Sequence, residues 1–415
     1  MKILHVCFSD KGGGAYIGAH RLHSCMLSQG VTSKLLVINK RTKDPTVIQA
    51  PMGLRIQNFV WKNLSKAILK LQRPIDREFR SMNIFPTSIS TIINKSDADI
   101  VQFHWISANT VGLPDFARIT KPIVWKMPDM WAFCGSEHYT YWDHRYRDGY
   151  TPSNRPPGHG GLDIDRYVWL TKKHYWDKKE FTIVCPSKWL ARCASSSELF
   201  RRRPIHNIPN PINLDIFKPA VDKILLRKYL NLPLNKKLVL FTSLQKINDP
   251  RKGFNYLDVC IEQLTKSIDP SSLAIVIMGV KSSYDSIRGI DIINMGYFMD
   301  DLGIALVYSS CDVCLFPSKA DSTPNTVKES MSCGTPCVAF DIEGVQEMIS
   351  HKINGYLAPV GDAMELAQGL KWVLSGDNQG LSKAARNAAC ILHDPRVIVT
   401  KYLDVYEGIL ADKNV

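Results

Sequence analysis

Residues 315–346 read LFPSKADSTPNTVKESMSCGTPCVAFDIEGVQ, and the fold class can be predicted from this stretch. The apolar run at 313–316 is typical of a buried parallel strand. Thr323 is expected to cap the helix that follows, Pro324 suits the first helical position, and Gly334 suits a left-handed stop. A second apolar strand comes next. The order of strand, loop, helix and strand predicts a parallel α/β unit.

The loop and helix start in this stretch are suited to binding an anion. A helix amino end carries about half a positive charge and open N–H donors, which here belong to Asn325, Thr326 and Val327. Two carboxylates flank these donors, Asp321 in the loop and Glu329 in the helix. We expect Asp321 to face a reacting group and Glu329 to accept hydrogen bonds from sugar hydroxyls. The pattern predicts a diphosphate site that requires no metal and no cofactor.

This stretch resembles the signature of retaining glycosyltransferases of family 4, which have the GT-B fold. In that family a glutamate, seven residues and a second glutamate precede a small-residue helix and a Gly-Thr-Pro-Val strand. Here Asp321, seven residues and Glu329 are followed by Gly334-Thr335-Pro336-Cys337-Val338. The first carboxylate is one methylene shorter than is usual in the family.

Other motifs extend the resemblance over nearly the whole chain. KILHVCFSDKGGGA resembles the first strand and glycine loop of the family, with Gly12, Gly13 and Gly14 where backbone approaches an anion. The family's further motifs follow in order: Asp129 to Phe133, Cys185 to Leu190, NIPNPINLDIFKP at 207–219, and the Lys-Gly turn Arg251-Lys252-Gly253-Phe254. The subgroup most similar to this chain includes transferases for colanic acid and O-antigen sugars.

The resemblance implies a set of donor-binding residues. Lys252 would offset the charge that develops on a leaving diphosphate. The family's arginine upstream of this lysine is absent, and either Lys246 or Arg251 takes its place. The expected donor-binding residues are Gly13, Gly14, Arg251, Lys252, Asn325, Thr326, Val327 and Glu329.

Acid–base and acceptor residues are expected in the amino-terminal half. His104 ends the strand IVQFH and Asp129 follows IVWKM, so both should lie at carboxyl edges of strands. The family's histidine before Asp129 is Pro128 here, and either His138 or the main chain takes its role. The resemblance implies catalytic roles for Asp321, Lys252, His138 and Asp129, and acceptor binding by His104, His138 and Tyr139. Purely structural roles for the two histidines stay open.

The segment 137–161 is rich in Tyr, His, Arg, Gly and Pro and shows little periodicity. Such a composition suits an ordered loop that meets the acceptor sugar. An irregular surface loop without a role is an equally good interpretation.

The length of 415 residues exceeds that of one hydrophobic core, so two domains are expected. Alternating strands and helices predict two parallel sheets, hence two Rossmann-like domains that face each other across a cleft. The expected domains are 1–218, which binds the acceptor, and 219–395, which binds the nucleotide sugar. A helix in 396–415 is expected to return to the first domain. Strands are predicted at 2–8, 34–38, 100–104, 123–127, 182–187, 205–210, 237–243, 273–279, 291–296, 313–318 and 336–341.

The net charge of +13 favours an acidic partner. No acidic residue occurs between Thr46 and Ile75, and Lys62, Lys66, Lys70 and Arg73 recur at helical spacing beside large apolar residues. A basic amphipathic helix at 54–73 is typical of binding to an anionic membrane surface. The alternative is an ordinary helix whose apolar face packs on the domain. Nucleic acid is not expected, because aromatic residues do not recur along a basic groove.

The eleven cysteines are scattered, and neither a secretory leader nor an 18-residue apolar span is apparent. We therefore expect a cytoplasmic protein that can attach peripherally to the inner face of the plasma membrane. Cys311, Cys314, Cys333 and Cys337 have paired spacing of the kind seen in zinc sites. Because each lies in or beside a predicted strand or core helix, we interpret them as small apolar core residues.

Together these observations predict a retaining glycosyltransferase with the GT-B fold. It would move a sugar from a nucleoside diphosphate sugar to a glycan or lipid-linked glycan in the assembly of bacterial surface polysaccharide. Retention at the anomeric carbon is implied by the resemblance alone. Two alternatives stay open: a nucleotide-sugar epimerase on the same fold, and a non-catalytic relative, which Asp321 and Pro128 would explain.

Overall fold

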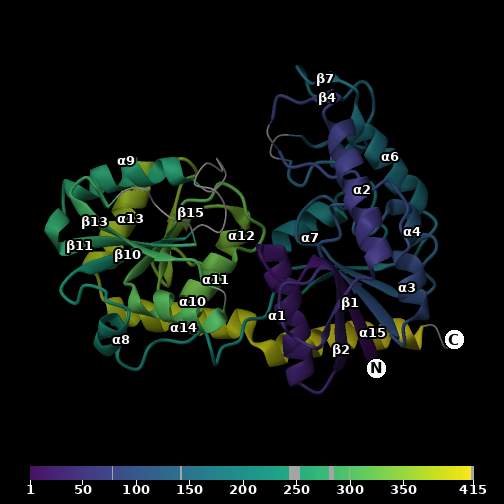
Figure 1. Cartoon of the computed structure of the whole chain (residues 1–415). Coiled ribbons are helices and arrows are strands. Elements are labelled where there is room, and N and C mark those ends of the chain that lie inside the picture. The colour runs from purple at the N-terminus through teal and green to yellow at the C-terminus, as the bar shows by residue number, and fades with distance from the viewer. Residues whose placement is uncertain (77, 141–142, 243–252, 280–284, 299, 413–415) are drawn as a thin grey trace. The chain divides into compact units, whose positions relative to one another are not determined.

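The computed structural model describes residues 1–76, 78–140, 143–242, 253–279, 285–298 and 300–412 (Figure 1). The chain divides into two compact units. Unit 1 comprises residues 1–210 and 398–415, and unit 2 comprises residues 211–397. The sequence placed the boundaries at 218/219 and 395/396, close to these divisions.

Unit 1 is built on a parallel sheet of seven described strands. In spatial order they are β3 (Val47–Gln49), β2 (Thr32–Asn39), β1 (Lys2–Ser9), β5 (Ile100–Phe103), β6 (Ile123–Lys126), β8 (Thr182–Cys185) and β9 (Ile205–Asn207). A short antiparallel pair, β4 (Gln72–Arg73) and β7 (Gly160–Gly161), lies outside the sheet.

Helices cover both faces of this sheet. They are α1 (Gly14–Ser28), α2 (Met52–Leu69), α3 (Ile89–Lys95), α4 (Leu113–Phe116), α5 (Arg145–Asp148), α6 (Ile164–Trp176), α7 (Lys188–Ser195) and α15 (Pro395–Ala411). Alternation along β1 separates the two layers: Leu4 and Val6 pack with α3, α4, α6 and α7, whereas Ile3 packs with α1 and α15. Apolar residues therefore bury both faces, as a parallel sheet requires.

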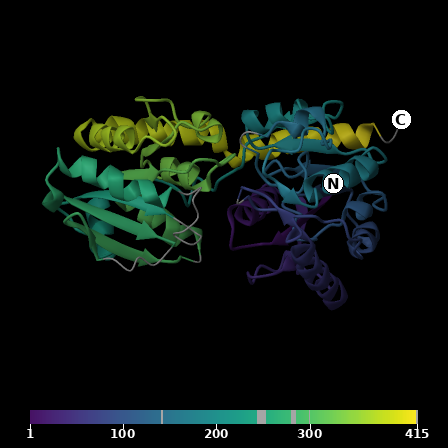
Figure 2. The same ribbon diagram turned by 90° about the horizontal axis from the view of Figure 1, so that it is seen from above.

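The carboxyl-terminal helix α15, at the yellow end of the colour bar in Figure 2, belongs to the core of unit 1 from Ile398 onward. Tyr402 and Tyr406 are fully buried against β1, β5, β6 and β8. The hydroxyl of Tyr406 donates a hydrogen bond to Oε1 of Gln102 in β5. The last helix of the chain thus packs, together with α1, on one face of the sheet that contains the first strand.

Unit 2 repeats the architecture with a second sheet of seven described strands. Their spatial order is β12 (Ser286–Ile287), β13 (Ile290–Gly296), β11 (Leu273–Met278), β10 (Lys237–Thr242), β14 (Val313–Phe316), β15 (Cys337–Phe340) and β16 (Gly355–Ala358). Every pair is parallel except β12 with β13. One core cluster joins the sheet to its helices. These are α8 (Lys223–Tyr229), α9 (Phe254–Thr265), the 3-10 turn Pro270–Ser272, α10 (Asp301–Ser310), α11 (Asn325–Ser332), α12 (Glu343–Gln346), α13 (Ala363–Ser375) and α14 (Asn378–His393).

All eleven predicted strands are present, with ends shifted by a few residues. The sequence missed β3, β4, β7, β12 and β16. Four of these have only two or three residues, and the fifth, β16, pairs at a sheet edge. Such segments carry too few positions for a periodic signal.

The four cysteines at 311, 314, 333 and 337 are buried in the core cluster of unit 2. Cys314 and Cys337 lie opposite each other on β14 and β15. Their interpretation as apolar core residues is confirmed by this packing. No helix of the described part of the chain combines the length and hydropathy needed to cross a bilayer.

Candidate functional site

In the sheet of unit 2, the direction in which successive strands are added reverses between β10 and β14. The chain runs from β10 outward to β11 and β13, then returns to place β14 on the other side of β10. Ligands of open α/β sheets bind outside the carboxyl ends of strands at such a switch point. The residues that end β10 and follow β14 meet here: Oγ1 of Thr242 lies 3.1 Å from Oγ1 of Thr326.

The loop after β14 is enclosed by two close backbone contacts. Gly253 has a φ of +68°, and a Cβ atom there would lie 1.9 Å from the carbonyl oxygen of Pro317. A Cβ atom at Gly344 would lie 2.1 Å from the carbonyl oxygen of Asp321. Any residue with a Cβ atom would clash at either position, so the conformation of the Asp321 loop depends on glycine at both 253 and 344. Lys246, Arg251 and Lys252 lie outside the described residues, and Gly253 directly follows Lys252.

Helix α11 begins one residue later than the sequence predicts. Pro324 is the capping residue, with ψ of 122°, and no side chain caps the helix. The expected cap by Thr323 is therefore wrong: the backbone N–H of Thr323 instead donates to Oδ1 of Asp321 at 3.2 Å, which fixes the loop. The amide groups of Asn325, Thr326 and Val327 form the first turn, as predicted. The stop at Gly334 is also confirmed, with φ of +71°.

Glu329 lies in α11 with 7% of its surface exposed. Beneath it is the fully buried Tyr308, and burial together with the Glu329 charge raises the pKa of this phenol well above its usual value. The carboxylate is thus held in a partly enclosed position one turn beyond the amino end of the helix. Tyr308 also interacts with the side chains of Thr242 and Thr326, so Thr326 and Glu329 share one buried neighbour.

In unit 1 the glycine loop leads into α1. Gly12 has a φ of +96°, and a Cβ atom there would lie 2.6 Å from Nη1 of Arg41. Gly13 is the capping residue of α1, which has neither a capping side chain nor an acidic residue in its first turn. Asp10, just before the loop, accepts hydrogen bonds from the backbone N–H groups of Arg41 and Thr42. Gly13 and Gly14 therefore lie at the amino end of α1, which no side chain caps.

The structure brings two predicted residues of unit 1 together. Nδ1 of His138 lies 2.7 Å from Oδ2 of Asp129, and Nε2 of His138 lies 3.0 Å from Oγ of Ser81. The other oxygen of Asp129 accepts from the backbone N–H of Trp131 at 3.0 Å. The imidazole is buried and is enclosed by the rings of Phe79, Trp105 and Trp131. These contacts fix the orientation of the Asp129 carboxylate.

The side chain of His104 does not have the expected exposure at the edge of the sheet. His104 follows β5, but its side chain is only 2% exposed, and its Nε2 lies 2.8 Å from Nδ1 of His5 in β1. Burial, with nearby His5 and Lys126, lowers the pKa of His104 well below its usual value. The ring thus turns into the interior. Its predicted contact with an acceptor stays a prediction that this burial does not favour.

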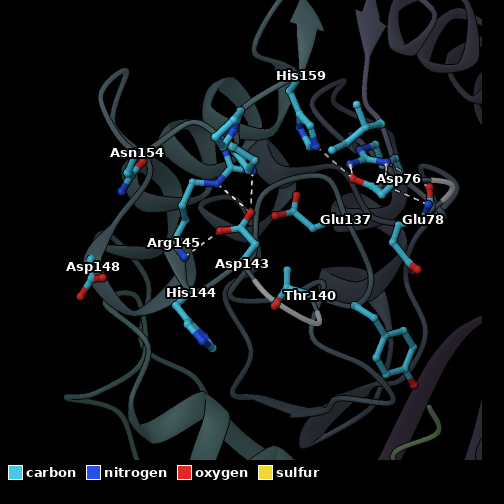
Figure 3. A pocket seen from close by; sticks show the side chains of 15 residues that line it. Asp76, Glu78, Glu137, Thr140, Asp143, His144, Arg145, Asp148, Asn154 and His159 are labelled. Atoms are coloured by element: carbon cyan, nitrogen blue, oxygen red, sulfur yellow. Dashed lines mark hydrogen bonds and ion pairs between the residues drawn. The ribbon is translucent and has the colours of Figure 1, made fainter. Parts of the chain in front are cut away.

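Tyr139 lines a cavity of about 510 Å³ within unit 1, together with residues of the 75–80 and 137–159 segments (Figure 3). The predicted acceptor loop therefore forms much of the wall of a defined pocket. Among the described residues no cluster of three or more His, Cys, Asp or Glu side chains is arranged to hold a metal ion.

Several residues of these sites were missed from the sequence. Ser81, Trp105 and Tyr308 carry no local signal, since their partners are distant in the chain. Thr242 could have been found, because it ends a predicted strand and the carboxyl ends of parallel strands meet at one edge.

Comparison with known proteins gives a family match for unit 2. Residues 236–376 match the family described as Glycosyl transferases group 1. The phosphatidyl-myo-inositol mannosyltransferase of Mycobacterium leprae is 30% identical over 206 residues, which cover 49% of this chain and 53% of that protein. The UDP-Gal:alpha-D-GlcNAc-diphosphoundecaprenol alpha-1,3-galactosyltransferase of Escherichia coli is 22% identical over 217 residues, covering 50% and 54%. The chain spans about half the length of these curated relatives.

Solved structures match over the whole chain. The sucrose-phosphate synthase of Thermosynechococcus elongatus has a TM-score of 0.70 at 17% identity and covers 99% of both chains. The Anabaena protein HepE, solved in complex with UDP, has a TM-score of 0.65 at 15% identity and covers 98% of this chain and 100% of its own. These similarities confirm the GT-B fold that the sequence predicted.

Proposed function

We propose that this chain, whose residues 236–376 carry the group 1 glycosyl transferase pattern, is a retaining glycosyltransferase. It moves a sugar from a nucleoside diphosphate sugar to a glycan or lipid-linked glycan in the assembly of bacterial surface polysaccharide. One observation carries the proposal: the uncapped amino end of α11 lies at the switch point of unit 2, with Asp321 before it and Glu329 within it.

Unit 2 is proposed to bind the donor. Cleavage of the sugar–phosphate bond leaves negative charge on the diphosphate, and the N–H groups of residues 325–327 are oriented to stabilise it. The family resemblance implies that Arg251 and Lys252 supply positive charge to the diphosphate. Gly253, the next residue, packs closely against Pro317 in the loop that leads to Asp321. Glu329 accepts hydrogen bonds from sugar hydroxyls, and Asp321 faces the reacting centre. The site is proposed to work without a metal or cofactor.

Unit 1 is proposed to bind the acceptor. Asp129 accepts a hydrogen bond from the acceptor hydroxyl, and His138 holds this carboxylate in place through the 2.7 Å contact. When Nδ1–H donates to Asp129, Nε2 is the acceptor of a hydrogen bond from the hydroxyl of Ser81. Gly13 and Gly14 contribute main-chain donors at the start of α1, as the resemblance implies.

The relatives support a uridine nucleotide as the first donor to test. The E. coli relative is named as a user of UDP-Gal, and HepE is solved with UDP and with UDP-glucose. The M. leprae and E. coli relatives are named for lipid or lipid-linked acceptors. We propose the same general acceptor class for this chain, on the cytoplasmic face of the membrane.

Helix α2 supports attachment to an anionic membrane. It buries Leu54, Asn58 and Ser65, and the amide of Asn58 donates to the carbonyl of Ala108 at 2.7 Å. Five other large apolar residues of the helix are exposed: Met52, Ile56, Phe59, Val60 and Leu64 have 40–64% of their surface accessible. Trp61 stacks on Phe85, and Ile68 and Leu69 pack against a core cluster, so α2 divides its apolar residues between the domain and the solvent.

Positive charge accompanies the outward apolar face. Lys66, Lys70 and Arg73 are exposed, and Lys62 lies 5.7 Å from the ring centre of Phe8. An exposed apolar face next to several cations fits a surface of anionic lipid. We therefore propose peripheral membrane binding through residues 54–73.

A donor screen tests the proposed function. The full chain is incubated with UDP-, GDP- and dTDP-sugars, and the shift of the unfolding temperature identifies the donor. The preferred donor is then incubated with lipid-diphosphate-linked glycans, and NMR of the product reports the anomeric configuration. We expect transfer with retention. Inversion of configuration, interconversion of the sugar without an acceptor, or binding without turnover would overturn the proposal.

A further inference from the structure

A second cavity of unit 1 lies at the amino ends of its strands, at the edge of the sheet opposite to the glycine loop. Its lining includes Lys2 at the start of β1, Lys34 near the start of β2 and Lys95 at the end of α3 (Figure 1). Gly13 and Asp129 instead follow the carboxyl ends of β1 and β6. The cavity has a volume of about 560 Å³, within the usual range of ligand pockets, roughly 300–1,000 Å³. It is therefore separate from the residues proposed to act on the sugar.

Apolar side chains from three strands and one helix line this cavity. The parallel pairing places Leu4 of β1 beside Lys34 of β2, and Leu36 of β2 beside Ile48 of β3. Paired residues of neighbouring strands point to the same face of a sheet. On that face, Ile92 of α3 packs against the core cluster that contains Leu4 and Leu36. Leu4 and Leu36 are buried, whereas Ile48 is 40% exposed and Ile92 is half-buried, so part of the apolar wall is accessible to a ligand.

Lysines outnumber carboxylates in the lining. Lys2, Lys34 and Lys95 are exposed, and Asp97 is the carboxylate that lines the cavity with them. Nζ of Lys2 lies 3.1 Å from Oδ2 of Asp97, and Nζ of Lys34 lies 3.7 Å from Oδ1. Asp99, outside the lining, accepts a hydrogen bond from the backbone N–H of Lys2 at 2.7 Å. One lining carboxylate is thus shared by two ammonium groups and a third lies at the same cavity, which favours an anion there.

Charge and apolar surface are arranged in sequence along the cavity. The lysines belong to the first residues of β1 and β2 and to the last residue of α3, whereas Leu36 and Ile48 lie further along the sheet. The hydrocarbon stem of a lysine can extend an apolar wall while its ammonium group stays in water. A molecule with one anionic end and one apolar chain is complementary to this arrangement.

We propose that this cavity binds a single alkyl chain that ends in an anionic group, such as a long-chain fatty acid. Its carboxylate lies among the ammonium groups of Lys2, Lys34 and Lys95, and its chain contacts Ile48 and Ile92. None of the donor-binding or acceptor-binding residues proposed above lines the cavity, so this inference goes beyond sugar transfer and does not depend on it.

Titration of straight-chain carboxylates tests the assignment. Decanoate, dodecanoate and tetradecanoate are titrated below their micelle concentrations into the full chain without nucleotide, and displacement of a fluorescent fatty acid gives each affinity. We expect affinity to rise about threefold or more at each step, because one fully buried CH₂ group contributes up to about fourfold. Dodecyltrimethylammonium, which has the opposite charge, should bind about tenfold more weakly than dodecanoate. Binding of no carboxylate, affinity that is independent of chain length, or equal binding of the cation would overturn the proposal.

Two variants locate the binding. Ile48→Ala should weaken dodecanoate about threefold or more, while Ile391→Ala, a matched change at a 78% exposed position on α14, should leave its affinity unchanged. Reversal of Lys34 and Lys95 to Glu should weaken dodecanoate about tenfold at low ionic strength. The matched control reverses the exposed Lys371 and Lys383. Binding that responds to neither Ile48→Ala nor the reversal of Lys34 and Lys95 would exclude this cavity.

Other occupants of the cavity would give different results. A dimer in sedimentation velocity that Ile48→Ala dissociates would identify a second copy of the chain as the occupant and overturn the proposal. Binding to phosphatidylserine vesicles that Ile48→Ala abolishes, without binding of free carboxylates, would assign the cavity to a membrane lipid and also overturn it. An unchanged oligomeric state and unchanged vesicle binding in Ile48→Ala would support the proposal.

The transfer assay separates this inference from the proposed function. Carboxylate binding that depends on Ile48, in a chain that transfers no sugar from any donor, would support the cavity and contradict the transferase. Sugar transfer by a chain that binds no carboxylate would support the transferase and contradict the cavity.

Discussion

The Nδ1 atom of His138 lies 2.7 Å from the Oδ2 atom of Asp129, although a turn of nine residues separates them in the chain. The backbone reinforces the contact, because the N–H of Met130 donates to the carbonyl of His138 at 3.0 Å. Aromatic rings exclude water from the imidazole. A carboxylate held in this way can accept a hydrogen bond from a substrate hydroxyl with little loss of conformational freedom.

Removing the charge of Asp129 should reduce turnover. Asp129→Asn keeps the shape of the side chain but removes its capacity as a base, and we expect kcat for sugar transfer to fall by about 10²- to 10⁴-fold. Ser81→Ala, which removes the outer partner of His138, should lower kcat less than tenfold. Steady-state kinetics with the donor found in the screen measures both. Asp129→Asn within twofold of wild type would contradict the role.

The two carboxylates of unit 2 should affect different steps. Glu329→Ala is expected to weaken nucleotide-sugar binding by about 10- to 100-fold, the usual effect of losing a hydrogen bond to a charged group. Asp321→Ala should mainly lower kcat. Calorimetric titration of the nucleotide sugar and steady-state kinetics separate the two effects. Wild-type affinity and wild-type kcat in both variants would show that residues 321–329 do not form the donor site.

Gly253 should be intolerant of a side chain. Gly253→Ala places a residue with Cβ at a φ of +68°, against the Pro317 carbonyl, and should cost about 2 kcal/mol or more. For a unit of this size the unfolding temperature would fall by about 4 °C or more. Gly53→Ala in α2 is the matched control, because a Cβ atom added there would have no neighbour within 4 Å. A fall no larger than that of the control would show that the close contact does not exist in solution.

The Glu137 carboxyl should make stability depend on pH. Its pKa is raised to about 8 by burial and by Asp165, so the folded state holds a proton that the unfolded state releases near pH 4.5. Its contribution to stability is complete below about pH 4.5 and is lost as pH rises through about 8. Glu137→Gln, a neutral mimic, should be more stable than wild type at pH 9 and should lack this dependence.

Urea unfolding at pH 6, 7, 8 and 9 measures the effect. The informative quantity is the difference in the free energy of unfolding between wild type and Glu137→Gln at each pH, because groups that do not interact with Glu137 contribute equally to both proteins. A difference that stays constant from pH 6 to pH 9 would show that Glu137 has an ordinary pKa.

Charge reversal on α2 tests membrane attachment. Changing Lys62, Lys66 and Lys70 together to Glu should reduce binding to phosphatidylserine vesicles by at least two orders of magnitude, since each cation near such a surface contributes about 1 kcal/mol. The matched control reverses Lys371, Lys383 and Lys401, which are exposed elsewhere. Co-sedimentation with vesicles is the measurement. Equal sedimentation of wild type and the α2 variant would reject the membrane surface.

Much of the fold was predictable because its signals are local. The run at 313–316 and the stop at Gly334 depend on residues that are neighbours in the chain, and the structure confirms both. The cap of α11 was predicted wrongly, because the Thr323 amide bonds to Asp321 and Pro324 takes the capping position. Asp321 and Glu329 were predicted as one site because they lie eight positions apart, in a loop and in the helix that follows it.

The amino-acid sequence alone was enough to predict the two largely parallel sheets and the loop and helix after β14, since strand and helix periodicity and glycine conformations are encoded within short segments. The directions of individual side chains follow from the tertiary packing: His104 turns inward to His5, His138 contacts Asp129, and five large apolar residues of α2 are left exposed. Each of these orientations depends on packing against segments distant in the chain, which compete for the same space and the same hydrogen-bonding groups.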